Sequence, residues 1–224
     1  MKIHRATYEI QGITRLLGSQ PADPEIRSQY IASKIAKRAS IEGDGVNKDS
    51  KGAEECAMLP EDEEKRGLTV FLRDKKGSVV LCDYVIKGFL KEAATALKHE
   101  LGIANAKSKI DNLVLITPAY LTICRDGEPL DVTDYDLERP LRAMTMQGPR
   151  VSVVASECIE PQWSIRFTVN MLDNEKTPKS AALTMEAIEE MLSYGEFKGL
   201  GQWRNGQNGR FNWRKVEDND GISD

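Results

Sequence analysis

The residues best suited to chemistry gather near the end of the chain, between Gly195 and Val216. Five glycines fall within 15 residues there, and five cations face a single acid, Glu196, for a local charge of +4. Exposed amides, guanidinium groups and aromatic rings are what a single-stranded nucleic acid needs for phosphate contacts and base stacking. The glycines are Gly195, Gly199, Gly201, Gly206 and Gly209, the cations are Lys198, Arg204, Arg210, Arg214 and Lys215, and the interleaved aromatics are Trp203, Phe211 and Trp213.

The glycines of this segment admit more than one interpretation. Glycine adopts positive φ and lets another backbone approach closely, so the segment either turns sharply or lies against a ligand. It is equally compatible with a plain helix-to-strand connection whose tryptophans belong to the core. The order of elements argues against a dinucleotide-binding turn, because such a turn follows a strand and opens a helix, the reverse of the order expected here. The sequence also lacks a Gly-Lys-Ser/Thr phosphate-binding motif.

The formal net charge of −4 conceals a segregation of charge along the 224 residues. Residues 42–64 hold nine acids and two lysines, a balance of −7, and the tail 217–224 holds four acids and no base. Since −4 is the sum of −11 and +7, the rest of the chain carries +7 and suits a polyanionic ligand. We expect 42–64 to be a mobile acidic insertion and 217–224 a disordered acidic tail. The insertion is either a solvated charge run or a flap over the basic body.

The elements that must position these residues are typical of an α+β protein. Strands are predicted over 3–10, 68–72, 78–81, 113–116, 120–123, 151–154, 163–169 and 209–216, and helices over 83–102 and 185–192. Asp83 and Thr184 are expected to cap the two helices. The basic, Met-rich stretch 139–150 is expected to be irregular, either facing a partner or nucleic acid or lying over the core. We expect one domain over 1–216, a mainly antiparallel sheet with helices on one face.

Composition indicates an ordinary globular chain, with 40% apolar and 29% charged residues. Because no window approaches 18 apolar residues and the start lacks the apolar core of a signal peptide, we expect no membrane association. The four widely spaced cysteines favour buried thiols in a reducing cytoplasm. No cofactor and no metal are expected. Asp131, Asp134 and Asp136 lack the Gly and Glu of an EF-hand, so they are interpreted as a polar turn or helix cap.

The motif Gly199-Leu200-Gly201-Gln202-Trp203-Arg204, followed by Gly209-Arg210-Phe211, resembles the C-terminal glycine-rich signature of the RAMP superfamily. That superfamily includes the crRNA-binding backbone subunits of type III CRISPR complexes, and the same layout looks like that of uncharacterised phage-encoded proteins. The segments 8–17, 83–91, 163–169 and 184–192 are similar, in order, to other parts of such proteins. The resemblance implies a ferredoxin-like (RRM-related) fold with long insertions.

The resemblance also implies a non-catalytic protein that binds single-stranded RNA or DNA. The loop amides, with Arg204 and Arg210, would contact phosphates, and basic residues of the first loop and first helix would extend the path. The whole expected set is Arg15, Lys87, Lys91, Lys198, Gly199, Gly201, Trp203, Arg204, Gly209 and Arg210. Backbone subunits assemble side by side, so a homo-oligomer or a complex with RAMP-like proteins is expected.

Two alternatives remain open. The chain could be a viral or accessory interaction protein that imitates or joins a ribonucleoprotein without binding RNA, since a −7 insertion would compete with RNA for a basic groove. It could also be a metal-independent ribonuclease, for which His4 and His99 are poorly placed. Backbone subunits that cut RNA place an aspartate in an early loop, where Asp44 or Asp49 could be nominated, but nine acids make that choice arbitrary.

Overall fold

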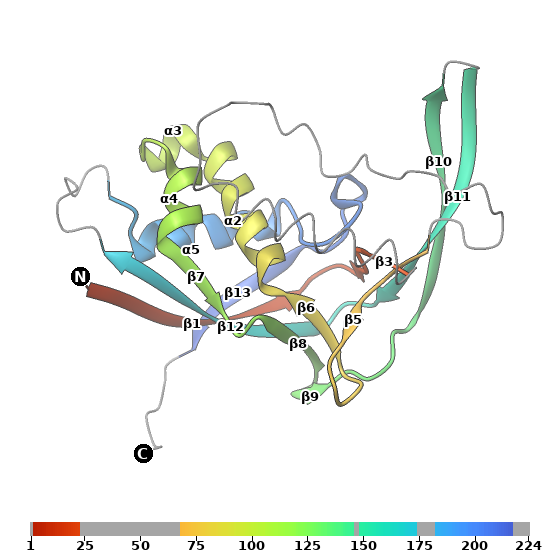
Figure 1. Cartoon of the computed structure of the whole chain (residues 1–224), viewed down its shortest axis with the longest axis horizontal. Helices are drawn as coiled ribbons and strands as arrows, with labels where there is room; N and C mark the ends of the chain where they lie inside the picture. The colour runs from red at the N-terminus through yellow and green to blue at the C-terminus, as the bar shows by residue number, and fades with distance from the viewer. Residues whose placement is uncertain (1, 23–67, 146–147, 174–181, 217–224) are drawn as a thin grey trace.

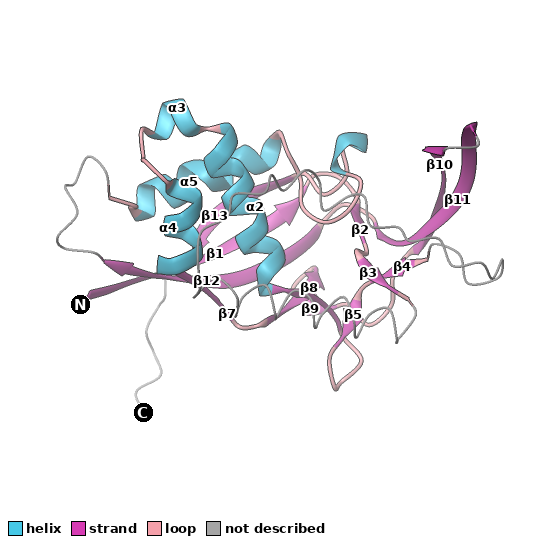
Figure 2. Ribbon diagram, turned by 45° about the horizontal axis from the view of Figure 1, so that its top comes forward, coloured by secondary structure: helices cyan, strands magenta, loops and turns pink. Residues whose placement is uncertain are grey.

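The computed structural model describes residues 2–22, 68–145, 148–173 and 182–216. In these residues the chain is a mixed α+β protein with two sheets, one large and one small, and few helices (Figure 1 and Figure 2). The coarse fold class predicted from the sequence is therefore confirmed. The acidic insertion 42–64 and the acidic tail 217–224 lie outside the described residues, and both remain predictions.

The large sheet brings the two ends of the described chain together. Its strands run in the order β13–β1–β12–β8–β6–β5, with β7 beside β12 and β9 beside β8, and every pairing is antiparallel. The bounds are β1 Lys2–Gly12, β5 Leu72–Arg73, β6 Val79–Cys82, β7 Val114–Thr117, β8 Tyr120–Arg125, β9 Glu128–Pro129, β12 Trp163–Asp173 and β13 Phe211–Val216. The first and last strands are thus neighbours, which places the loop after β1 beside the loop before β13.

Side-chain alternation gives this sheet one apolar and one polar face. Tyr8 and Ile10 of β1 lie opposite Phe167 and Ile165 of β12, and all four are almost completely buried. Three helices cover this face, as Figure 1 shows, and complete the main core. They are α2 Asp83–Ala96, α4 Ala106–Leu113 and α5 Met185–Ser193, while the short α3 Lys98–Leu101 follows α2.

On the opposite face of the sheet, ion pairs link β1 with its two neighbouring strands. Glu9 of β1 is 8% exposed and accepts hydrogen bonds from Arg166 of β12 at 2.9 Å and Arg214 of β13 at 2.8 Å. Burial alone would raise the pKa of the Glu9 carboxyl, but the two guanidinium groups outweigh it and lower that pKa. This face therefore buries a carboxylate between two cations that are themselves mostly exposed.

The helices match the sequence pattern except at one cap and one missed element. The predicted apolar stripe of α2 is buried, but the prediction that Asp83 caps it is wrong, because Cys82 takes the N-cap position. Strand β6 runs straight into α2, with Cys82 still opposite Tyr120 in the sheet, so Asp83 falls in the first helical turn. Helix α4 was not predicted, since its polar sequence buries only two residues. Thr184 caps α5 as predicted, accepting from Ala187 N at 3.2 Å.

The small sheet corrects the prediction for 139–150. Its order is β10–β11–β4–β3, with β2 beside β11, and only the β11–β4 pairing is parallel. The bounds are β2 Leu16–Leu17, β3 Gln20–Pro21, β4 Thr69–Val70, β10 Tyr135–Thr145 and β11 Gly148–Ile159. The stretch expected to be irregular instead lies in a long hairpin that projects from the body in Figure 1. Continuous backbone pairing forms it without an apolar–polar alternation, and Pro140 is tolerated because β10 is an edge strand.

Two further expectations concern cysteines and membranes. Cys82 and Cys158 are buried and Cys124 is half-buried, and no disulfide joins these three, while Cys56 lies outside the described ranges. No helix among the described residues is long and apolar enough to cross a membrane.

Candidate functional site

The glycine-rich loop between α5 and β13 packs against the loop that follows β1. Gly209 N donates to Arg15 O at 2.7 Å, and Ile13 N donates to Arg210 O at 2.8 Å. The Thr14 hydroxyl adds two more links, donating to Gln207 O and accepting from Arg210 N. Two short 3-10 turns, Tyr194–Glu196 and Arg204–Gly206, shape the loop between these anchors. Segments almost 200 residues apart in sequence therefore form one surface.

Internal packing explains the glycines at the centre of this loop. A Cβ on Gly199 would lie 2.2 Å from Asn208 O, and one on Gly209 would lie 2.0 Å from Leu200 O. Gly209 also has a φ of +73°, and Gly201 has a φ of +75°. The interpretation of the glycines as a sharply turning loop accounts for these positions. The amide of Gly209 is bonded to Arg15 O in the loop after β1, which removes it from the expected phosphate contacts.

Asn208 holds the loop together from within. It is 1% exposed, its Oδ1 accepts from Arg15 Nε at 2.9 Å, and its Nδ2 donates to Trp203 O at 2.9 Å and Gly206 O at 3.2 Å. A buried amide with its oxygen and nitrogen both bonded fixes the backbone around it. Asn208 was not predicted as a site residue, because a lone asparagine gives no pattern in the sequence by which its burial could be recognised.

The predicted cations of the loop lie on this surface, each tied to a neighbour. Lys198 Nζ donates to Asn205 Oδ1 at 2.9 Å, Arg204 pairs with Glu92 of α2, and Arg210 Nε donates to Glu196 O at 2.6 Å. Some N–H donors of these cations are not used by these contacts. Among the described residues, the terminal nitrogens of Arg210 make no hydrogen bond. The geometry fixes the cations in place and keeps part of their donor capacity toward solvent.

Lys87 and Lys91 point to another part of the molecule. Lys87 Nζ donates to Asp111 O at 2.8 Å, and Lys91 Nζ donates to Asp111 Oδ1 at 3.1 Å. Asp111 belongs to α4, whereas the loop contacts α2 through Glu92, on a different side of that helix. The structure therefore does not bring these two lysines together with the loop, and their place in a binding path stays a prediction without structural support.

The aromatics divide between the core and the surface. Phe211 is fully buried against Phe89, with ring centroids 5.2 Å apart, and Trp213 is half-buried with its Nε1 bonded to Ser193 Oγ at 3.0 Å. Trp203 is 37% exposed. The interpretation that the tryptophans belong to the core thus holds in part for Trp213, which packs against the core, and fails for Trp203, which is exposed.

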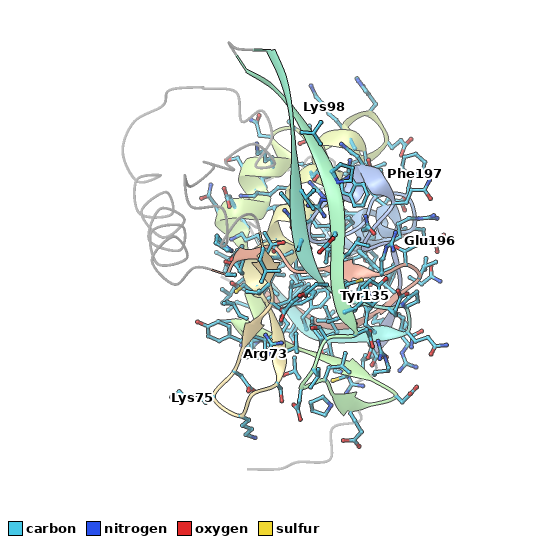
Figure 3. All side chains as sticks on the ribbon, turned by 90° about the vertical axis from the view of Figure 1, so that its right-hand side faces the viewer. Arg73, Lys75, Lys98, Tyr135, Glu196 and Phe197 are labelled. Atoms are coloured by element: carbon cyan, nitrogen blue, oxygen red, sulfur yellow. The ribbon has the colours of Figure 1, made fainter. Side chains whose placement is uncertain are left out.

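Phe197 is the aromatic that the sequence analysis missed. Its side chain is 80% exposed, and in Figure 3 it lies with Glu196 at the outer edge of the molecule. Its ring centroid is 6.0 Å from that of Tyr194, which in turn stacks on buried Phe89 at 6.4 Å. One signal was available: an aromatic residue between Glu196 and Lys198, just past a helix end, has little reason to be buried.

Arg139 of β10 is a second missed residue, buried where the hairpin meets the loop. It is 5% exposed, and its Cζ lies 4.9 Å from the centroid of the Trp203 ring. Its Nη2 lies 3.2 Å from Gln202 Oε1, in the orientation where the Gln202 amide nitrogen donates to Gly18 O. Burial lowers the pKa of the Arg139 guanidinium. The sequence analysis treated it as one charge of an irregular basic stretch.

The candidate acid–base residues lie away from this surface. His4 bonds Asp173 at 3.3 Å, and it sits eight residues from Gly12 on β1, about 26 Å at the rise of an extended strand. His99 is exposed on α3. A small cavity lined by residues of β3 to β6 holds about 10 Å³, room for one water. The groups that the loop itself presents are cations and the exposed rings of Phe197 and Trp203.

Two of the three aspartates considered as a metal loop, Asp131 and Asp134, are engaged in other contacts. Asp134 accepts from Arg125 Nη2 at 2.6 Å and from Glu160 N at 2.7 Å, and the Arg125 hydrogen bond lowers the pKa of the Asp134 carboxyl. Asp131 accepts from Ser78 Oγ at 3.0 Å. Within the ranges that the structure describes, no three His, Cys, Asp or Glu side chains are grouped to hold a metal ion. Asp134 organises a polar turn, one of the two roles expected for this segment.

No protein-family model fits the chain, and no curated protein sequence is significantly similar to it.

Proposed function

We propose that this chain is a non-catalytic single-stranded nucleic-acid-binding protein of RAMP type, with RNA as its ligand and the surface of residues 195–210 as its binding surface. The observation that carries the proposal is Phe197, an 80% exposed ring beside the cations Lys198 and Arg210. An exposed ring among cations is the arrangement by which proteins stack a base and hold its phosphates.

The order of the central strands supports the ferredoxin-like part of the proposal. Counting only β1, β7, β12 and β13, the chain runs strand, helices, strand, strand, helix, strand, and the sheet order is β13–β1–β12–β7. These four strands and the helices between them follow the order βαββαβ with strand order 4-1-3-2, which is the order expected of a ferredoxin-like fold and so supports this part of the proposal. The small sheet and its hairpin would then be the insertions expected in RAMP-like proteins.

The surface charge favours an anionic ligand. Lys198, Arg204, Arg210 and Arg15 are opposed there by Glu92 and Glu196, which leaves a local charge of +2. Phosphate contacts of this kind position a strand without reading its sequence, so we expect affinity that falls steeply with salt and depends little on base identity. Catalysis is not part of the proposal, since both histidines lie away from the surface. Thiols without a disulfide among the described cysteines fit a cytoplasmic location.

The test is a titration of labelled oligouridylate and oligodeoxythymidylate of roughly 20 nucleotides, longer than the site of one such domain, over a range of salt. The variant Phe197→Ala should weaken binding by about 1–3 kcal/mol, the value of one stacked base. Its stability should not change, because the side chain is 80% exposed. Val132→Ala is the matched control, since Val132 is an exposed apolar residue (75%) outside the loop.

The proposal is wrong if neither the whole chain nor a variant lacking 42–64 binds either oligonucleotide at low ionic strength. Binding that is seen only in the deletion variant would instead assign the acidic insertion an autoinhibitory role.

A second function, protein–protein interaction, is favoured by the projecting hairpin. Val151 and Val153 of β11 are 63% and 57% exposed and lie on the same face of a two-stranded ribbon. Exposed valines on an uncovered ribbon are typical of a docking element. This candidate predicts self-association, or binding to a RAMP-like partner, that falls when both valines become threonine. Light scattering after size-exclusion chromatography measures it, and a concentration-independent monomer in both proteins contradicts the self-association.

A further inference from the structure

The face of the large sheet that points away from the helices carries more cations than acids. Figure 1 shows α2, α4 and α5 together on the other side of β1, β12 and β13. Because side chains alternate along a strand, every second residue of these three strands points to this open face. The charged residues among them have a balance of +2, and they are Arg5, Glu9, Arg166 and Arg214.

Glu9 fixes two of these cations side by side. Its carboxylate accepts from Arg166 Nη2 at 2.9 Å and from Arg214 Nη2 at 2.8 Å, and Glu9 itself is 8% exposed. The two arginine side chains are 62% and 63% exposed. Across the residues that the structure describes, their other guanidinium nitrogens make no hydrogen bond. A buried carboxylate thus orders two exposed guanidinium groups that keep unused donors.

The neighbours of this pair on the open face are mostly hydroxyl and amide side chains. Thr7 and Thr168 lie two residues along the strands and share a hydrogen bond at 3.0 Å. The row on the other side of the pair consists of Gln11, Ser164 and Asn212. The exposed apolar residues Ile3 and Leu115 lie toward the far end of the face. Arginine, hydroxyl and amide side chains bind phosphate and sugar oxygens, whereas the centres of protein interfaces are apolar and poor in charge.

The open face continues from the glycine-rich loop. Strand β13 begins directly after that loop, and Arg214 is four residues beyond Arg210, about 14 Å at the rise of an extended strand. We propose that the open face is a second contact surface for the same single strand, and that the guanidinium groups of Arg166 and Arg214 bind its phosphates. This inference rests on the proposed function, because it extends the path of the same ligand.

The contact on the open face is with the backbone of the strand and not with its bases. The aromatic residues of β1, β12 and β13 all point to the helix-covered face, so these strands offer no ring for stacking on the open one. Guanidinium groups match the geometry of phosphate oxygens. The loop therefore supplies the stacked base through Phe197, and the open face supplies phosphate contacts that do not depend on sequence.

The variant Arg166→Gln tests the contact while Arg214 still pairs with Glu9. Affinity for oligouridylate should fall by about fivefold to tenfold near 0.1 M salt, and the slope of log affinity against log salt should shrink by about one. Arg73→Gln is the matched control, since Arg73 also pairs with a largely buried carboxylate, Glu157 at 2.9 Å, but at the opposite edge of the sheet. Its affinity should stay within about twofold. Wild-type affinity and salt slope in Arg166→Gln overturn the proposal, and the face then serves another partner, such as a protein.

The variant Glu9→Gln distinguishes a binding cluster from a merely structural one, because it should change stability and affinity in opposite directions. An amide oxygen binds guanidinium groups more weakly than a carboxylate does, so the melting temperature should fall. The open face meanwhile goes from +2 to +3, so affinity for oligouridylate should rise. A lower melting temperature with unchanged affinity contradicts the proposal. If Glu9→Gln does not fold, the comparison of Arg166→Gln with Arg73→Gln decides.

Inorganic polyphosphate, which has phosphates but no bases, separates this proposal from the proposed function. It should compete with oligouridylate for the wild type and bind Arg166→Gln more weakly than Arg73→Gln. If oligonucleotides do not bind but polyphosphate binds in an Arg166-dependent way, the nucleic-acid function fails and the open face remains an anion-binding surface. If oligonucleotides lose affinity in Phe197→Ala but not in Arg166→Gln, the contact on the open face fails alone.

Discussion

The glycine-rich loop 195–210 and the β10–β11 hairpin meet at Arg139, yet they are stabilised in different ways. The loop buries its polar groups in a network centred on Asn208, and its glycines allow backbones to touch. The hairpin is held by backbone pairing, and it exposes Val151 and Val153. The conformation of the loop thus depends on particular side chains and glycines, whereas the conformation of the hairpin depends mainly on backbone hydrogen bonds, which many sequences can make.

Because of this difference, the side chains that maintain the structure are of different kinds in the two regions. In the loop, glycine and asparagine are structural requirements, and only the side chains that project from it, such as Phe197 and Arg210, are available for function. In the hairpin, backbone pairing forms the structure, and Val151 and Val153 are exposed side chains that project from it. Arg139 joins them, because it belongs to the hairpin but is buried by the loop.

The largest effect should come from Gly209→Ala. The new Cβ would lie 2.0 Å from Leu200 O at a φ of +73°, so the backbone must move. We expect the free energy of unfolding to fall by about 3 kcal/mol or more. Gly102→Ala is the control: its φ is +62° but nothing lies within 4 Å, so only the left-handed backbone costs, about 1–2 kcal/mol. Urea denaturation measures both. Equal losses would mean that the loop is not tightly packed.

Asn208→Ala should cost less, about 2–3 kcal/mol, because it leaves Arg15 Nε and two carbonyls without their buried partner. Asn205→Ala removes an exposed amide whose one partner among the described residues is Lys198, so the free energy of unfolding should change by no more than about 0.5 kcal/mol. Thermal unfolding of the two variants compares them directly. A similar, small effect of both would contradict the central role of Asn208.

The smallest effects should be found in the hairpin. Val154, 7% exposed, faces the body, whereas its neighbour Val153 is 57% exposed on the other side of the strand. We expect Val154→Ala to cost about 1–2 kcal/mol from lost burial, and Val153→Ala no more than about 0.5 kcal/mol. Denaturation midpoints measure the pair. A large cost at Val153 would show that the ribbon is covered, for example by a second copy of the chain.

Sequence patterns were reliable where one residue type has one physical role. The alternation of β1 and β12, the apolar spacing of α2 and the Thr184 cap follow from local geometry, and the structure has all three. They were unreliable where partners are distant. The hairpin over 139–150 is made by pairing with another strand, and α4 by packing of two residues on α2 and the sheet.

The sequence by itself determined that the chain is an α+β protein and that its cations and glycines concentrate in the last loop. Only the tertiary structure decided which of those residues are available. It buried Phe211, turned Lys87 and Lys91 toward Asp111, exposed Phe197 and enclosed Arg139 beside Trp203. The reason is that composition depends on local chain chemistry, whereas burial and hydrogen bonding depend on segments almost 200 residues apart that the sheet brings into contact.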